Sequence, residues 1–137
     1  MATELIVYNK ILTQRYVTDY LYDPNFPIVN VAIGVSKPVI NNQEPGFIVR
    51  ETTIQELFKR TIYARYNERT IVQKGVTLPP EATLPPAPVP FSPSLEATAR
   101  YFYTLLLPEI KKLNITLDYV AVISPLATAR FGRNMNA

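Results

Sequence analysis

The chain has 137 residues, of which 47% are hydrophobic and 18% charged, and its formal net charge is +3. This length allows one domain of ordinary size or two small lobes. Histidine and cysteine are absent, which removes the commonest general acid-base group, thiol nucleophiles and disulfide bonds.

The first 22 residues are rich in aromatic and β-branched side chains. Residues 4–14 fit a helix, because Leu5, Tyr8 and Leu12 recur at helical spacing, and they fit a strand equally well. Polar and apolar residues then alternate over residues 16–22, which predicts a strand. Two prolines with Asp and Asn neighbours in residues 23–27 predict a turn.

Alternation continues in residues 28–35, where four β-branched residues share one side. This pattern predicts a half-buried strand. Pro38 restricts any continuation to an edge or a bend. Residues 41–46 form the clearest turn in the sequence, and residues 47–50 are expected to leave it as a short strand.

A first helix is predicted from a capping box, in which Thr53 and Glu56 satisfy each other's backbone N–H groups. Its expected buried stripe is Ile54, Leu57, Phe58 and Ile62. Arg65 and Arg69 continue the stripe after the apolar residues stop. We interpret them as the helix end, because Asn67 is a natural terminator and arginine is favourable in a last turn.

Residues 77–93 form a proline-rich strap that contains seven of the thirteen prolines. Proline fixes φ and lacks an N–H, so this segment is expected to run as polyproline II rather than as a helix or a central strand. At about 3.1 Å per residue it spans roughly 50 Å and can reach a neighbouring chain. Its predicted contacts with a partner are Leu78, Pro79, Pro80, Leu84, Pro85, Pro86 and Pro88.

A second helix follows the strap, with Ser92 as its expected N-cap and Pro93 in its first turn. Its core stripe is Leu95, Ala99, Phe102, Leu106, Ile110 and Leu113. Further apolar residues lie off this stripe, which indicates a helix central to the core or covered by another subunit. These predicted interface residues are Tyr101, Tyr103, Leu105 and Leu107. Pro108 is expected to kink or break the helix.

Residues 115–123 alternate clearly and are apolar on much of both faces, which predicts an inner strand. The remaining residues, 124–137, resemble an extended arm. Within this arm Arg130, Phe131 and Arg133 are predicted to contact a partner.

Together these elements predict an α+β fold with a small, mostly antiparallel sheet and two main helices separated by a polyproline II strap. The predicted parts are an N-terminal α+β lobe (1–74), the strap (75–93) and a C-terminal helix-strand segment with a tail (94–137). The last part is expected to pack with the first as one domain.

The sequence offers little for catalysis. Asp19 and Asp23 could form a carboxylate pair, but scattered acids are usually solvated surface. No calcium loop and no glycine-rich phosphate loop is present. We therefore predict a protein that is not an enzyme, with no cofactor and no metal ion.

The apolar helix, the strap and nine tyrosines favour protein interfaces, because tyrosine buries large area at low entropic cost. We predict a structural subunit of a larger assembly, most concretely a virion component of a phage tail, neck or baseplate. The partners would be other subunits, including copies of the chain. One alternative is an adaptor whose strap is a polyproline ligand. The other is a basic ribonucleoprotein subunit, although the basic residues are dispersed.

No apolar run approaches the roughly 20 residues of a membrane span, and no signal peptide is evident. The expected location is the cytoplasm at synthesis and then an assembled particle.

Overall fold

The structure is a computed structural model that describes residues 2–25, 27–38 and 48–132. Its strands are β1 (Ala2–Val17), β2 (Tyr20–Tyr22), β3 (Ile28–Pro38), β4 (Arg69–Gln73), β5 (Pro86–Val89), β6 (Thr116–Ile123) and β7 (Thr128–Gly132). The helices are α1 (Glu51–Phe58), the π-helix η1 (Lys59–Tyr63), α2 (Ala64–Tyr66) and α3 (Leu95–Lys111). The first three helices follow one another without a break.

All the strands belong to one sheet of seven strands, with the order β5-β4-β1-β3-β6-β7 and β2 paired to β1. The pairs β1/β3, β3/β6, β6/β7 and β1/β2 are antiparallel, whereas β1/β4 and β4/β5 are parallel. The α+β class is therefore right, but the prediction of a small, mostly antiparallel sheet is partly wrong, because the sheet has seven strands and two of its six pairings are parallel. The sheet is larger because β4, part of the strap and part of the tail all join it.

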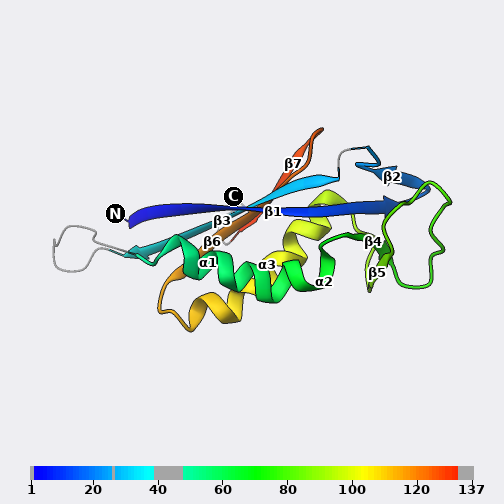
Figure 1. The fold of residues 1–137 in the computed structure, drawn as a ribbon. Coiled ribbons are helices and arrows are strands. Elements are labelled where there is room, and N and C mark those ends of the chain that lie inside the picture. The colour runs from blue at the N-terminus through cyan, green and yellow to red at the C-terminus, as the bar shows by residue number, and fades with distance from the viewer. Residues whose placement is uncertain (1, 26, 39–47, 133–137) are drawn as a thin grey trace.

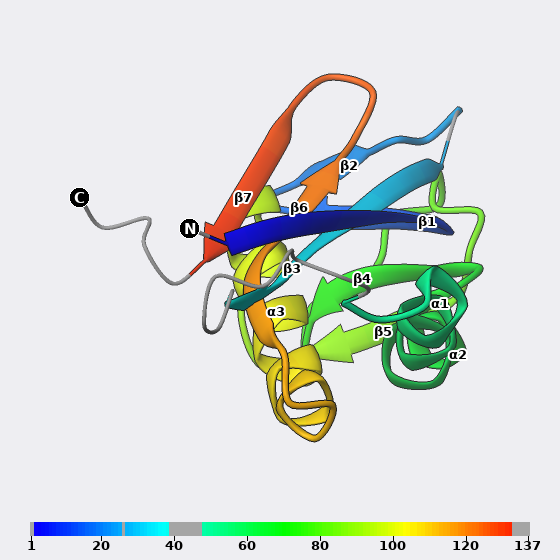
Figure 2. The same ribbon diagram turned by 90° about the vertical axis from the view of Figure 1, so that its left-hand side faces the viewer.

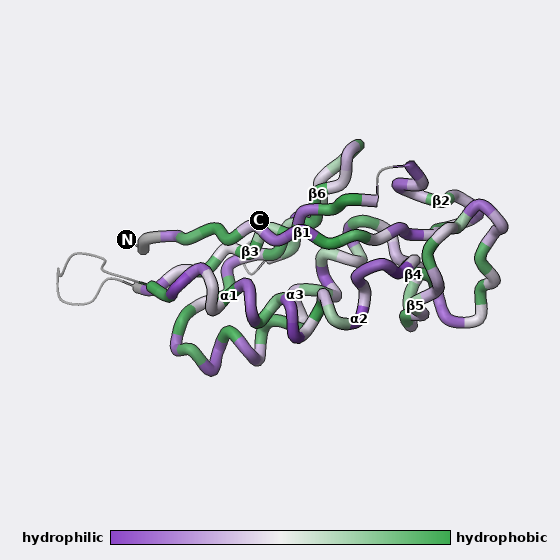
Figure 3. Tube along the Cα trace, in the orientation of Figure 1, coloured by the Kyte–Doolittle hydropathy of each residue, from purple (hydrophilic) through white to green (hydrophobic). Residues whose placement is uncertain are grey.

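The helices cover one face of the sheet (Figures 1 and 2). The predicted stripe of the first helix is confirmed, since its four apolar residues are all buried. On α3 the residues Leu95, Ala99, Phe102, Leu106 and Ile110 are buried as predicted. Hydrophobic and hydrophilic residues alternate along α1 and α3 in Figure 3, as expected for helices with one buried side.

Residues 4–14 are strand and not helix. Leu5, Val7 and Ile11 lie on the helix-covered side of β1, and residues 2–12 pair with β3 over their whole length. Period-2 burial against two helices stabilises the strand more than a helical stripe would. The expected strand over 16–22 is interrupted, because Thr18 and Asp19 have positive φ values of 48° and 66° and form a turn to β2.

Several predicted helix boundaries are wrong. Arg50 is the N-cap of α1 and makes no side-chain cap hydrogen bond, so the capping box at Thr53 is not used. The N-cap of α3 is Ser94 rather than Ser92, and its hydroxyl accepts from Ala97 N at 3.1 Å. Pro108 lies inside α3, which continues to Lys111. The lost N–H bond at Pro108 evidently costs less than the apolar packing of the last turn contributes.

The expected strand over residues 47–50 is also wrong: residues 48–50 carry no regular structure, and Phe47 lies outside the described residues.

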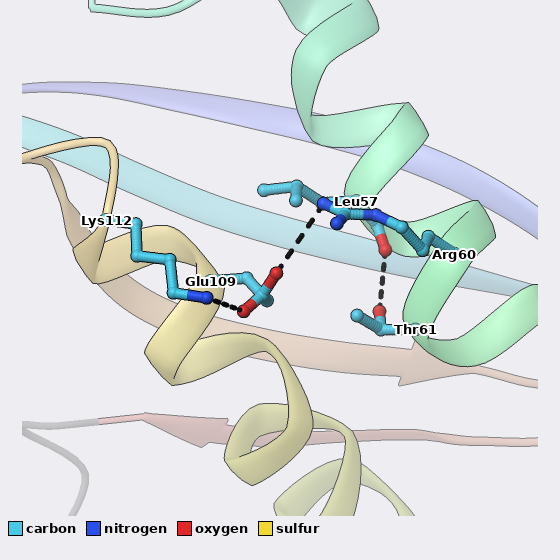
Figure 4. A network of polar contacts seen from close by, with 5 residues as sticks. All are labelled: Leu57, Arg60, Thr61, Glu109 and Lys112. Carbon is cyan, nitrogen blue, oxygen red and sulfur yellow. Dashed lines mark hydrogen bonds and ion pairs between the residues drawn. The ribbon is translucent and has the colours of Figure 1, made fainter.

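The two helical segments are joined by a cluster around Glu109 (Figure 4). Its carboxylate accepts from Lys112 Nζ at 2.9 Å and lies 3.5 Å from Arg60 Nη2 on the π-helix. The pKa of Glu109 is lowered, first by the Lys112 hydrogen bond. Thr61 donates to the Leu57 carbonyl at 2.6 Å beside this cluster.

The strap is held by its own chain. Residues 86–89 pair with β4 as the edge strand β5. Thr70 Oγ1 lies 2.8 Å from the Leu84 carbonyl oxygen and 3.1 Å from Gln14 Oε1, so its single proton is shared between these two acceptors, and Gln14 is fully buried. Gln14 Nε2 in turn lies 3.3 Å from Thr83 Oγ1.

The predicted strand 115–123 is confirmed as β6, but the predicted arm is wrong in its first half. Residues 128–132 are β7, which pairs with β6 along its length. Ala129 and Phe131 face the helices, and the Phe131 ring packs edge-on against Tyr103 at 5.1 Å. In the described part of the chain, no helix is long and apolar enough to cross a membrane.

Candidate functional site

A pocket of about 610 Å³ lies at the N-terminal end of α3. Four segments far apart in sequence form its wall: the end of β1, β2, the start of α3, and the β6–β7 turn with β7. The lining residues are Arg15, Val17, Tyr22, Ser94, Leu95, Glu96, Ser124, Leu126, Ala127, Thr128, Ala129 and Arg130. We call this the Arg15 pocket.

Arg15 is a charged residue in the interior, with 3% of its surface exposed. Nη1 donates to the Pro93 carbonyl at 3.1 Å, and the guanidinium lies 4.5 Å from the centre of the Tyr22 ring. Nε is buried and has no hydrogen-bond partner among the described residues. Burial lowers the pKa of Arg15, and Asp23 and Glu96 partly offset this effect. Because Arg15 is also one of the residues that line the pocket, the pocket is suited to a ligand with an acceptor group.

The start of α3 adds to this polarity. The first backbone N–H groups of a helix have no partner within the helix and carry partial positive charge. Ser94 satisfies one of them through Ala97 N, and Glu96 projects from the first turn with an exposed side chain. The pocket thus holds a carboxylate acceptor as well as arginine donors.

An unusual stack lies on the helix-free face of the sheet. The Tyr119 ring lies directly over Gly34, where no side chain intervenes. The Arg130 guanidinium lies 3.7 Å from the centre of the same ring, a cation–π contact. Arg130 is also among the residues that line the Arg15 pocket, but the stack holds its guanidinium on the other face of the sheet.

The residues predicted as partner contacts do not gather at this pocket, with the exception of Arg130. Among the strap residues Leu78, Pro79 and Leu84 are half-buried, whereas Pro80, Pro85, Pro86 and Pro88 are exposed. Tyr103 is buried, and its hydroxyl lies 3.4 Å from the Leu117 carbonyl. Tyr101 hydrogen-bonds Tyr66 at 3.0 Å, and Leu105, Leu107 and Phe131 pack partly on the core. Arg133 lies outside the described residues.

Sequence reasoning missed Arg15, Tyr22 and Glu96. One signal was available: Arg15 stands within a strand between positions that become buried, where a charge is rare unless it has a role. Nothing in the local sequence indicates that residues 15, 96 and 130 meet, because turns and a crossover bring them together.

The Asp19–Asp23 pair receives no support as a catalytic pair. Asp19 is exposed and accepts from Tyr16 Oη at 3.3 Å, while Asp23 has one carboxylate oxygen buried without a partner among the described residues. The described ranges also contain no group of three or more His, Cys, Asp or Glu residues that could hold a metal ion.

Comparison with known proteins gives a fold but no family. No family model matches the chain, and no curated protein matches it. Among solved structures, the chain is similar to an uncharacterised protein from Wolinella succinogenes, with a TM-score of 0.74 and 14% identity over 98% of this chain and 99% of the other. It is also similar to 6-pyruvoyl tetrahydropterin synthase from Plasmodium vivax, with a TM-score of 0.67 and 16% identity over the same shares. Two variants of that synthase, in which a catalytic glutamate is replaced, match at a TM-score of 0.64 with 15% identity.

These comparisons overturn the functional prediction from the sequence. The chain shares its fold, over nearly its whole length, with a synthase. The predictions of a virion structural subunit and of a protein that is not an enzyme are therefore wrong, and an assembled particle as its location has no support. The alternatives of a polyproline adaptor and a ribonucleoprotein subunit gain no support from these neighbours. The prediction of a protein without catalytic activity was wrong because the absence of histidine and cysteine does not exclude a catalytic site.

Proposed function

We propose that the protein is an enzyme that binds a reduced pterin, or a similar flat heterocycle with an acidic or carbonyl substituent, in the Arg15 pocket. The observation that carries this proposal is a pocket wall that holds both a guanidinium, that of Arg15, and a carboxylate, that of Glu96. The full-length likeness to 6-pyruvoyl tetrahydropterin synthase supports the ligand class.

The donor and acceptor pattern of a pterin matches these groups. One edge of the heterocycle carries adjacent N–H donors, which a carboxylate accepts as a pair. A carbonyl or carboxylate substituent accepts from a guanidinium and from free N–H groups at a helix start. Glu96 would hold the donor edge, and Arg15 would hold the substituent.

The same groups can support proton transfer beside a carbonyl. Buried or fixed cations stabilise negative charge that develops on a carbonyl oxygen. A carboxylate such as Glu96, or the Tyr22 phenol, can exchange a proton with the neighbouring carbon or oxygen. Arginine in this role does not lose its charge, which keeps the field constant during the reaction.

The test is a binding titration with intrinsically fluorescent pterins. Pterin-6-carboxylate should bind roughly 10- to 100-fold more tightly than 6-methylpterin, because a charge-assisted hydrogen bond contributes about 1.5–3 kcal/mol. Arg15→Lys should abolish this preference, and Glu96→Gln should weaken both ligands. Arg65→Lys and Glu56→Gln change exposed residues on α2 and α1 and are matched controls.

Turnover is tested by incubating the protein with a panel of reduced pterins and analysing the products by mass spectrometry. Product formation should be lost in Glu96→Gln and kept in Glu56→Gln. Failure of every pterin to bind, with a correctly folded protein, would refute the proposed ligand class.

A further inference from the structure

The Arg15 guanidinium is covered by two neighbours in the structure. Only 3% of the surface of Arg15 is exposed. On the side of α3, Nη1 donates to the Pro93 carbonyl at 3.1 Å. The guanidinium carbon also lies over the Tyr22 ring, 4.5 Å from its centre. A ligand in the Arg15 pocket therefore gains full access to the guanidinium only when one of these two neighbours moves.

The neighbour on the side of α3 is firmly held. The residue after Pro93 is Ser94, which caps the helix: its hydroxyl accepts from Ala97 N at 3.1 Å and its carbonyl accepts from Thr98 N at 2.9 Å. Leu95, the first residue of α3, is buried in the core. A shift of Pro93 would disturb the first turn of a helix of 17 residues.

The strand that carries Tyr22 is held much more weakly. β2 has three residues, and among the described strands it pairs only with β1, at residues 15–17. Tyr20 is 55% exposed, and Leu21 and Tyr22 are half-buried. In contrast, β7 pairs with β6 through five residues and buries Ala129. A segment with few buried contacts and little pairing opens at a lower free-energy cost than the rest of the fold.

Both ends of β2 have the backbone conformation expected of hinges. Thr18 and Asp19 precede the strand with φ values of 48° and 66°, and Asp23 follows it with φ of 61°. This left-handed region is uncommon for residues other than glycine, and a β-branched residue such as Thr18 is an outlier there. Strained backbone of this kind occurs at ligand clamps and switch regions. A change of φ at these positions moves residues 20–22 as a unit and leaves β1 in place.

We propose that β2 is a lid on the Arg15 pocket, which turns about residues 18–19 and 23 and lifts the Tyr22 ring from the guanidinium to admit a ligand. Figures 1 and 2 place β2 on the opposite side of β1 from α1 and α2, so these helices do not obstruct the movement. The inference rests on the proposed function for the identity of the ligand, whereas the movement itself does not depend on it.

A reversible cross-link tests the lid. Tyr16 on β1 and Leu21 on β2 lie directly opposite each other, and the Cα atoms of such a pair are about 4.5–5.5 Å apart, a separation that a disulfide bridges. Their side chains alternate with those of Arg15 and Tyr22. The chain contains no cysteine, so Tyr16→Cys with Leu21→Cys forms one intramolecular bond, which holds β2 closed when oxidised and frees it when reduced. Leu21→Cys alone is the matched control.

The first readout needs no ligand. Phenylglyoxal modifies accessible arginines, and peptide mass spectrometry gives the rate at Arg15. Modification of a covered group follows the population of the open state, so Arg15 should react about tenfold more slowly in the oxidised double variant than in the reduced one. The rate at the exposed Arg65 should be the same in both. Equal rates at Arg15 in the two redox states, or an equal change in the Leu21→Cys control, would overturn the lid.

The second readout separates the lid from the ligand. Pterin-6-carboxylate, followed by stopped-flow fluorescence, should associate about tenfold more slowly with the oxidised form, and dithiothreitol should restore the rate. Equal association with both forms would overturn the lid and leave the proposed function intact. Binding to neither form, while Arg15 is protected from phenylglyoxal only in the oxidised form, would overturn the ligand class and leave the lid intact.

Amide exchange takes the place of the cross-link should the disulfide not form. The amides that pair β2 with β1 should exchange about tenfold faster than those that pair β7 with β6, because β7 also has a single strand partner among the described residues but a buried side chain to hold it. Equal exchange in the two strands would overturn the lid.

Discussion

Replacing Gly34 with alanine tests the stack that positions Arg130. A Cβ at this position would overlap Tyr119 Cε2 and lie 2.7 Å from Cδ2 and Cζ of the same ring. The ring cannot simply lift away, because the Arg130 guanidinium lies 3.7 Å from its centre on the other side. The pairing with β6 also shifts register between Gly34 and Val35, which fixes the backbone there.

Two effects oppose each other in this variant. Replacing glycine by alanine in a permitted conformation stabilises by about 0.4–1 kcal/mol through the unfolded chain. Overpacking a well-filled contact costs about 1–3 kcal/mol. We expect a net loss of about 1–2 kcal/mol, equivalent to a fall in Tm of about 3–8 °C for a chain of this size.

The assay is urea and thermal unfolding of four proteins: wild type, Gly34→Ala, Tyr119→Ala and the double variant. With the ring gone, Gly34→Ala should be neutral or slightly stabilising, so the coupling energy should exceed about 1 kcal/mol. A single variant as stable as wild type, or a coupling energy near zero, would show that the stack does not constrain this face.

Three further changes test other parts of the structure. Phe102→Ala removes a fully buried ring from α3 and should cost about 3–5 kcal/mol in urea unfolding. Gln14→Ala removes a buried side chain that contacts Thr70 and, in the strap, Thr83; it should cost about 1–3 kcal/mol and speed amide exchange in residues 77–85. The pKa of Asp23 is raised by burial, with Arg15 opposing, so the folded state binds its proton more tightly than the unfolded chain. Stability from this group falls as pH rises from the ordinary aspartate pKa through the raised one, and Asp23→Asn should flatten the unfolding profile in that window.

Sequence periodicity predicted the parts of the fold in which one face of an element is buried. The alternation in residues 28–35 and 115–123 gave β3 and β6, and the helical stripes were right on both main helices. Boundaries were less accurate, because Ser92 and Ser94 are equally good caps by sequence. The packing of Leu95 then selects Ser94.

The rest depends on contacts that local sequence does not encode. β5 has two prolines and four residues, so only its pairing with β4 makes it a strand. β7 carries a short alternation of Ala129 and Phe131, which is visible once a neighbouring strand is known. The Arg15 pocket joins positions about 80 and 115 residues apart in the chain, and no spacing rule connects them.

The strap shows how one chemical property can lead to two opposite conclusions. From sequence, the missing N–H groups of Pro86 and Pro88 predicted a segment that needs a partner. In the structure the segment needs no partner chain, because β5 pairs with β4 of the same chain. Pro86 and Pro88 are exposed on the outer side of β5, where no further strand requires an N–H group from them. Proline on an edge strand prevents uncontrolled pairing of that edge with another strand. The prolines of β5 therefore block further pairing at this edge of the sheet.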